Sequence, residues 1–259
     1  MGRWLGVVLA AVLLGGPAGP AWAQAEKPAE KTPTAEEYLA ESNALMAKKD
    51  FAKALSKLLM AWLQAPDNTQ VICRVGDLFM ATNKPADATR FYAVAIRLDP
   101  RQEAPVIGLA EAYFAVNRAD QALILLDEPA RKAAFGKSAR FQQLLGRAYT
   151  FTGKADKAIP LLRAALAQAP QLHALYGELG NACYLAKKYA DAADAYGKAL
   201  EKDPKDANAA LYRSMAFEKL GKWPDAVAAL HTYLALINPP VDDAQRKRLA
   251  ELQAKGKGT

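Results

Sequence analysis

The sequence is poor in the residues that most often carry catalysis or hold metals. Its 259 residues include 2 histidines and 2 cysteines. His173 and His231 stand apart, and neither has cysteines or carboxylates at the spacing that a metal site requires. No H-E-x-x-H, G-x-S-x-G or glycine-rich phosphate loop occurs, and no nucleophile has a base partner. We therefore expect a protein that is not an enzyme and that uses no metal and no cofactor.

The basic residues are not clustered either. The formal net charge is +7, but Lys and Arg are spread along the chain. Nucleic-acid-binding proteins usually gather them on one element, so we expect no nucleic-acid binding and only a mild bias toward acidic partners. Hydrophobic residues make up 52% of the chain and charged residues 24%, which is the balance of a folded protein.

The longest apolar run stands near the N-terminus and is too short to span a bilayer. Residues 5–14 follow Arg3 and precede helix-breaking Gly and Pro and an A-x-A site that ends at Ala23. A spanning helix needs about 20 apolar residues. The pattern predicts a cleaved secretory signal over residues 1–23, hence a periplasmic location and no stable membrane insertion after cleavage. An uncleaved anchor is the alternative. Residues 24–34 predict a flexible leader.

From Ala35 onward the chain repeats one pattern. Each unit has a small residue where two helices would cross, and these are Ala54, Ala88, Ala122, Ala158, Ala192 and Ala226. A large residue follows four positions later, at Leu58, Tyr92, Leu126, Leu162, Tyr196 and Leu230. A proline closes most units, at Pro66, Pro100, Pro170, Pro204 and, one position late, Pro239. Since a larger residue at the alanine position would push the helices apart, the pattern predicts closely paired helices.

A second set of positions marks the first helix of each unit. The core position is taken by Leu45, Phe79, Tyr113, Tyr149, Cys183 and Phe217. A small residue precedes it by three, at Ser42, Gly76, Ala110, Gly146, Gly180 and Ser214. Four positions after it stand Lys49, Asn83, Asn117, Gly153, Lys187 and Gly221, where a left-handed residue would end the helix. Each unit therefore predicts helix, tight turn, helix.

These positions resemble the tetratricopeptide-repeat family, whose period is about 34 residues, and with the signal they indicate an exported bacterial member. The units are 35–68, 69–102, 103–138, 139–172, 173–206 and 207–240. The resemblance implies an all-α, right-handed superhelical solenoid of about six units. Residues 241–259 predict a polar capping helix followed by a loose tail from Lys255.

The third unit departs from the pattern. Asp127, Glu128 and Pro129 interrupt its second helix, and two extra residues follow before the next unit. Because proline disrupts a helix interior, we expect the helix to end near Leu126 and to restart over 131–135. The break is either a tolerated loop insertion or a joint between units one to three and units four to six.

In this family the first helices line a concave surface where ligands lie, so the resemblance implies a peptide or protein ligand there. The candidate protein-binding residues are Asn43, Met46, Met80, Phe114, Arg147, Asn181 and Tyr184. Met46, Met80, Phe114, Thr150 and Tyr184 take one position in successive units. They predict either an apolar and aromatic binding stripe or core packing between first helices. Leu39 replaces the first asparagine of the family's carboxylate clamp, so no such clamp is predicted.

The two cysteines lie three units apart. Packed helices are separated by about 8–10 Å, so the sulfurs of Cys73 and Cys183 should be at least ~20 Å apart, far beyond the reach of a disulfide. We expect no internal disulfide. Cys183 is predicted to be a core residue. Cys73 could face the groove, where it would be either an inert thiol or a thiol that cross-links a dimer.

The function predicted from these features is a periplasmic protein–protein interaction scaffold or assembly factor. It would serve cell-envelope assembly, pilus biogenesis or secretion. The alternatives are a chaperone for an exported enzyme or cytochrome and a self-assembling structural protein.

Overall fold

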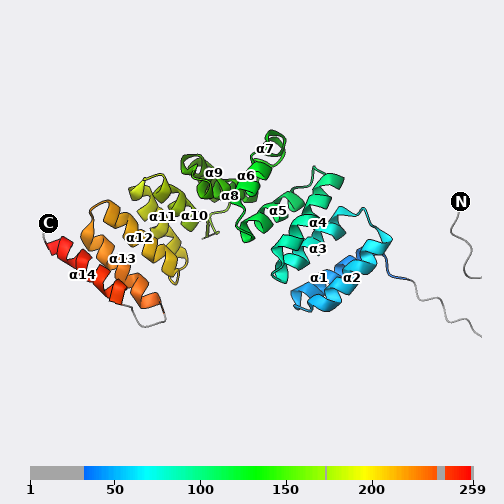
Figure 1. The fold of residues 1–259 in the computed structure, drawn as a ribbon, viewed down its shortest axis with the longest axis horizontal. Helices are drawn as coiled ribbons and strands as arrows, with labels where there is room; N and C mark the ends of the chain where they lie inside the picture. The colour runs from blue at the N-terminus through cyan, green and yellow to red at the C-terminus, as the bar shows by residue number, and fades with distance from the viewer. Residues whose placement is uncertain (1–31, 173, 238–242, 258–259) are drawn as a thin grey trace, which may run out of the picture. The chain divides into compact units, whose positions relative to one another are not determined.

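The computed structural model describes residues 32–172, 174–237 and 243–257. The chain divides into two units, Met1–Thr34 and Ala35–Thr259, and all of the described helices belong to the second (Figure 1). The predicted signal peptide, its cleavage site and most of the leader lie outside the described residues, as do His173 and Pro239.

The described part of the second unit is built from helices alone. They are α1 (Ala35–Ala47), α2 (Phe51–Gln64), α3 (Thr69–Ala81), α4 (Pro85–Leu98), α5 (Glu103–Ala115), α6 (Ala119–Leu126), α7 (Pro129–Phe135), α8 (Ala139–Phe151), α9 (Ala155–Gln168), α10 (Ala174–Leu185), α11 (Tyr189–Lys202), α12 (Ala207–Lys219), α13 (Trp223–Leu236) and α14 (Asp243–Lys257).

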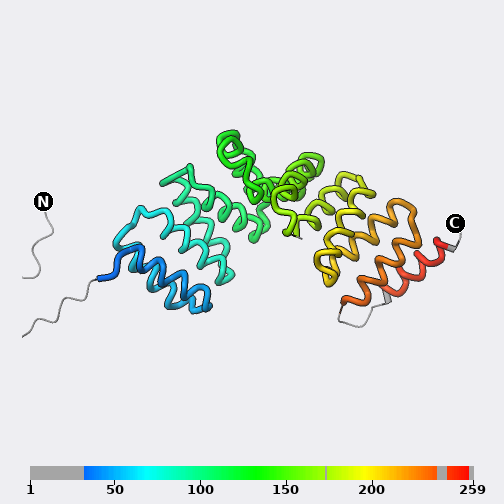
Figure 2. The backbone as a smooth tube through the Cα atoms, turned by 180° about the vertical axis from the view of Figure 1, so that it is seen from behind, coloured from blue at the N-terminus to red at the C-terminus, as the bar shows by residue number. Residues whose placement is uncertain are grey.

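The paired helices pack against each other within a unit and against the neighbouring units along the array. The pairs α1–α2, α3–α4, α5–α6, α8–α9, α10–α11 and α12–α13 form the units. Each second helix also packs on the first helix of the next unit, for example α4 on α5 and α11 on α12 (Figure 2). This confirms the predicted all-α repeat solenoid.

The alanine at each helix crossing is fully buried. All six, from Ala54 to Ala226, expose none of their surface, and the large residues four positions on expose 3% or less. The helices can approach closely because only a methyl group separates them. The packing between helices thus follows from two repeated positions.

The tight turns have the predicted backbone. Positive φ occurs at Lys49 (61°), Asn83 (57°), Asn117 (57°), Gly153 (76°), Lys187 (60°) and Gly221 (71°). These are the six positions at which the sequence predicts a left-handed residue, and that prediction is confirmed. Four of them are not glycine, so those turns keep some backbone strain.

The irregular third unit is ordered by side-chain bonds. Helix α6 ends at Leu126 as expected, and α7 restarts at Pro129, two residues earlier than expected. The reason is that proline suits the first position of a helix, where its missing N–H would have no partner. Asp127 accepts hydrogen bonds from the Tyr149 hydroxyl (2.7 Å) and from Lys132 (2.8 Å), which anchor the break on α8 and α7. That the break acts as a joint stays a prediction.

The C-terminal helix packs on the last unit, and its role as a cap stays a prediction. Leu252 of α14 is buried against the last unit, and its Arg248 pairs with Glu218 of α12. Residues 255–257 were expected to be loose, but α14 runs through Lys257. The Lys255 ammonium lies 5.0 Å from the ring centroid of Trp223, and this contact supports the last turn. The predicted start of this helix, at Val241, lies outside the described residues.

Candidate functional site

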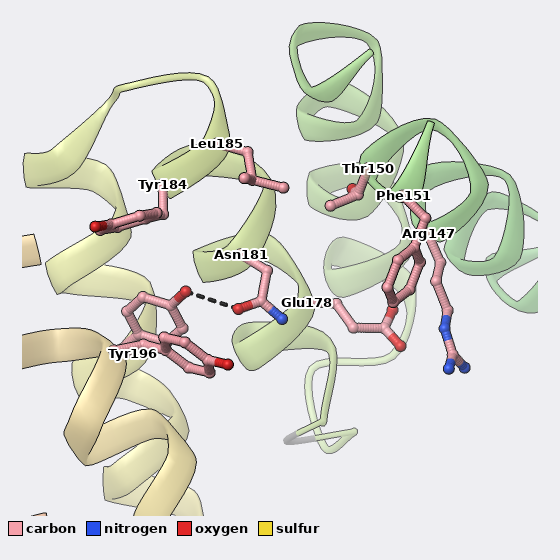
Figure 3. Close-up of a pocket in the computed structure, with 9 residues that line it drawn as sticks. Arg147, Thr150, Phe151, Glu178, Asn181, Tyr184, Leu185 and Tyr196 are labelled. Atoms are coloured by element: carbon pink, nitrogen blue, oxygen red, sulfur yellow. Dashed lines mark hydrogen bonds between the residues drawn. The ribbon is translucent and has the colours of Figure 1, made fainter. Parts of the chain in front are cut away.

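A cavity of about 510 Å³ lies between helices of units four to six. We call it the α8–α12 cavity. It is lined by Arg147, Thr150 and Phe151 of α8, Glu178, Asn181, Tyr184 and Leu185 of α10, Tyr196 of α11 and Tyr212 of α12 (Figure 3). Its volume falls within the range of about 300–1,000 Å³ that is typical of ligand sites. Aromatic and aliphatic side chains form most of its wall.

Four of the seven candidate residues meet at this cavity. Arg147, Asn181 and Tyr184 line it. Phe114 of α5 adjoins it, because its ring lies 4.6 Å from the Arg147 guanidinium and 6.1 Å from the Phe151 ring.

The other three candidates lie elsewhere. Asn43 is exposed and lines a separate polar hollow with Cys73 and Asp77. Met46 packs on a small cluster of core residues in the first two units, and Met80 packs on the main core. Phe114 and Tyr184 also pack on the main core while remaining half-buried, and Thr150 is buried. The predicted stripe is therefore partly core, and its open part gathers at units four and five.

Several cavity residues were not among the candidates. Phe151 is 66% exposed and Leu185 is 57% exposed, at one equivalent position near the end of a first helix. In the first three units that position holds alanine, at Ala47, Ala81 and Ala115. A comparison of this position between units would have marked units four and five as different.

Tyr196 is buried at the cavity and holds Asn181 by a hydrogen bond. Its ring packs against Gly180, and its hydroxyl donates a 2.7 Å hydrogen bond to Asn181 Oδ1. It also stacks on Tyr212, with ring centroids 5.8 Å apart. Because the Asn181 carbonyl is engaged, its amide nitrogen is directed away from Tyr196, toward the space beside Glu178 (Figure 3).

The second unit shows that this arrangement has a structural component. The Tyr92 hydroxyl donates a 2.7 Å hydrogen bond to Asp77, which takes the same position as Asn181. Tyr92 packs closely on Gly76 and also on Gly108. Tyr212 takes the position of Gly108 in its own unit, so an aromatic ring replaces a glycine at the cavity.

Arg147 is held by aromatic rings rather than by a carboxylate. Its guanidinium lies 4.6 Å from the Phe114 centroid and 5.7 Å from the Phe151 centroid. Among the described residues it makes no ion pair within 4 Å. Since aromatic rings are not hydrogen-bond acceptors of the ordinary kind, its N–H groups remain available to a ligand.

Glu178 is the acidic residue of the cavity. Burial raises the pKa of its carboxyl group, while a hydrogen bond from Gln143 and the charges of Arg147 and Arg140 act in the opposite direction. One oxygen, Oε2, is covered and has no hydrogen-bond partner. Arg140 is itself engaged, because it donates to Gln143 (2.7 Å) and pairs with Glu111 of α5. The carboxylate therefore lacks a full set of donors.

Two features are absent from the described part of the chain. It contains no group of three or more His, Cys, Asp or Glu side chains placed to hold a metal ion. None of its helices is both long enough and apolar enough to cross a bilayer. Both cysteines are free thiols there; Cys183 is buried in the core and Cys73 is half-buried.

The fold is a stack of helix pairs. Two family models described as tetratricopeptide repeat match the chain. One matches residues 144–207 and 178–240, and the other matches residues 79–148. Together they cover more than half of the chain, which belongs to the tetratricopeptide-repeat family. No curated protein sequence matches it.

Solved structures share the fold at low identity. PilW, a type IV pilus biogenesis factor, matches with TM-score 0.70 and 16% identity, over 83% of this chain and 98% of that chain. YrrB, a TPR protein with an unusual peptide-binding site, matches with TM-score 0.61 and 15% identity, over 75% and 97%. The APC/C hetero-tetramer Cut9–Hcn1 matches with TM-score 0.68 and 19% identity over 85% of this chain, which spans only 43% of that chain.

Proposed function

We propose that this protein is an exported, non-catalytic scaffold that holds an extended segment of a partner protein in the α8–α12 cavity. Members of this repeat family bind peptides or proteins, and the cavity is the observation that carries the proposal. Exposed Phe151 and Leu185 offer apolar contacts, and Arg147 and Asn181 offer N–H donors for the carbonyl groups of an extended chain.

We place this scaffold in the periplasm, in envelope assembly, pilus biogenesis or secretion. The support for export is the pattern of residues 1–23, with its A-x-A site at Ala23. The support for the pathway is the similarity in fold to PilW. Cell fractionation followed by mass spectrometry tests the location; a protein that begins at Gln24 is expected in the periplasmic fraction, and an intact N-terminus on membranes would contradict it.

The binding test uses residues whose removal should not unfold the chain. Phe114 and Tyr184 pack on the core, so their alanine variants would confuse binding with stability. Phe151→Ala with Leu185→Ala removes two exposed side chains instead. The matched control is Ile124→Ala, which removes a 69% exposed side chain from α6, outside the cavity.

Each variant, expressed from Gln24, is used to capture partners from the native cell envelope. We expect one partner to be retained by the wild type and by Ile124→Ala and lost by the double variant, with unchanged helicity by circular dichroism. Equal capture by all three proteins would refute the cavity as the binding site. The identity of the partner separates an assembly factor from a chaperone for an exported enzyme or cytochrome.

Self-assembly is a second candidate, favoured by the outer face of α2. Leu59, Met60 and Leu63 expose 44%, 46% and 80% of their surfaces within five residues. Exposed apolar side chains grouped on one helix are typical of a contact surface. A second copy of the chain is the occupant that this candidate requires. Light scattering of wild type and Leu63→Lys tests it; monomers in both would exclude it.

A further inference from the structure

The α8–α12 cavity combines aromatic walls with a carboxylate that lacks donors. Phe151, Tyr184 and Tyr212 contribute aromatic rings to its wall, and Tyr196, which is only 1% exposed, is stacked on Tyr212. Tyr184 is supported by Tyr189, with an edge-to-face contact at 5.4 Å between ring centroids. Aromatic faces attract cations, and a partly buried carboxylate binds charged donors more strongly than neutral ones.

Glu178 is the group that a donor would meet. Its side chain extends from α10 across the space toward α8 (Figure 3). Oε2 is covered and has no partner, so the charge on the carboxylate is only partly compensated. Glu178 lines the cavity, and because the last side-chain torsion of glutamate is broad, its two oxygens can exchange places.

We infer that the α8–α12 cavity anchors a basic side chain, lysine or arginine, of the partner's extended segment. This rests on the proposed function. The aliphatic stem of the basic residue lies along Leu185 and the tyrosine rings, and its cationic head donates to Glu178. Long basic side chains suit such a site because they combine an apolar stem with a charged end.

Arg147 is compatible with this assignment. Its guanidinium lies beside the Phe114 and Phe151 rings, whose centroids are 6.1 Å apart. From there its N–H groups bind carbonyl oxygens of the partner's backbone. The net charge of +7 acts at long range, whereas the basic anchor is selected by contact with one carboxylate inside the cavity.

The probe is a phage-displayed library of random dodecapeptides, selected on the chain from Gln24. Glu178→Gln keeps the shape of the side chain and removes its charge. The control is Glu201→Gln, which makes the same change on the exposed face of α11. We expect Lys or Arg beside an apolar residue to be enriched on wild type and on Glu201→Gln, and not on Glu178→Gln.

The second measurement uses the most enriched peptide and its variant with norleucine in place of the basic residue. We expect both Glu178→Gln and the norleucine change to weaken binding about tenfold, the loss of one charge-assisted hydrogen bond, and their combination to add little. Additive effects would overturn the inference.

The outcomes separate this inference from the proposed function. Peptides that bind through Phe151 and Leu185 but carry no basic residue would overturn the basic anchor and leave the scaffold in place. Enrichment of tryptophan or tyrosine would do the same, and would indicate a neutral donor to Glu178. If no peptide is enriched on any protein, both are refuted.

Discussion

Replacing Gly180 by alanine should destabilise the array, although alanine is the better helix former. A Cβ at Gly180 would lie 2.5 Å from Tyr196 Cε1 and under 3 Å from two more atoms of that ring. Tyr196 is 1% exposed, is stacked on Tyr212 and is hydrogen-bonded to Asn181, so its ring cannot move aside.

The magnitude follows from two opposing effects. Overpacking a closed core costs about 1–3 kcal/mol, and glycine to alanine in a helix contributes about 0.5–1 kcal/mol of stability. The two ranges leave a net loss between about 0 and 2.5 kcal/mol, with a central value of about 1 kcal/mol. The same helix offers a control, because a Cβ at Gly177 meets no atom within 4 Å. Gly177→Ala should therefore gain about 0.5–1 kcal/mol.

Thermal unfolding followed by circular dichroism measures both variants. For an array of this size we expect the Tm to fall by roughly 2–4 °C for Gly180→Ala and to rise by roughly 1–4 °C for Gly177→Ala. If both variants raise the Tm, the tyrosine ring is not confined and the account of this helix contact is wrong.

Three further predictions concern single side chains. Burial raises the pKa of the Glu178 carboxyl group, so the folded chain binds its proton more tightly than the unfolded chain does. The folded state therefore loses stability as the pH rises from the ordinary glutamate range through the raised pKa. Glu178→Gln should thus be the more stable protein at neutral pH and lose this advantage in acid, as melting curves at both pH values will show. Burial raises the thiol pKa of Cys73 and of Cys183 to about 11. A thiol reagent should therefore react with two thiols per chain, slowly in the native protein and fast in denaturant. Fewer than two reactive thiols would indicate a disulfide. Lys187 has φ 60°, so Lys187→Gly should not destabilise the turn, whereas Lys187→Val should cost about 1–2 kcal/mol in urea unfolding.

The helices and their turns were predictable because they depend on neighbours in sequence. The alanine at each crossing, such as Ala54, and the left-handed turn residue, such as Lys49, recur in every unit, and each has a local steric reason. The start of α7 was placed two residues late, since Pro129 was treated as a breaker although it also suits a helix start.

The site was predictable only in part. Arg147, Asn181 and Tyr184 were found from the register of the first helices, and the structure brings them to one cavity. Met46 and Met80 have the same register but pack on core clusters. Position within a unit shows which way a side chain points, but it does not show whether neighbouring units leave space beside it.

The sequence by itself determined the class of fold, because the positions that define a repeat, such as the small residue at the helix crossing and the turn residue, act on neighbours within one or two turns of helix. Only the tertiary structure decided where a ligand could bind. The α8–α12 cavity arises where Phe151, Glu178, Leu185 and Tyr212, from three different units, surround one space. Its size and charge depend on how helices of neighbouring units pack against one another, and the repeated pattern within one unit does not give the distance between units.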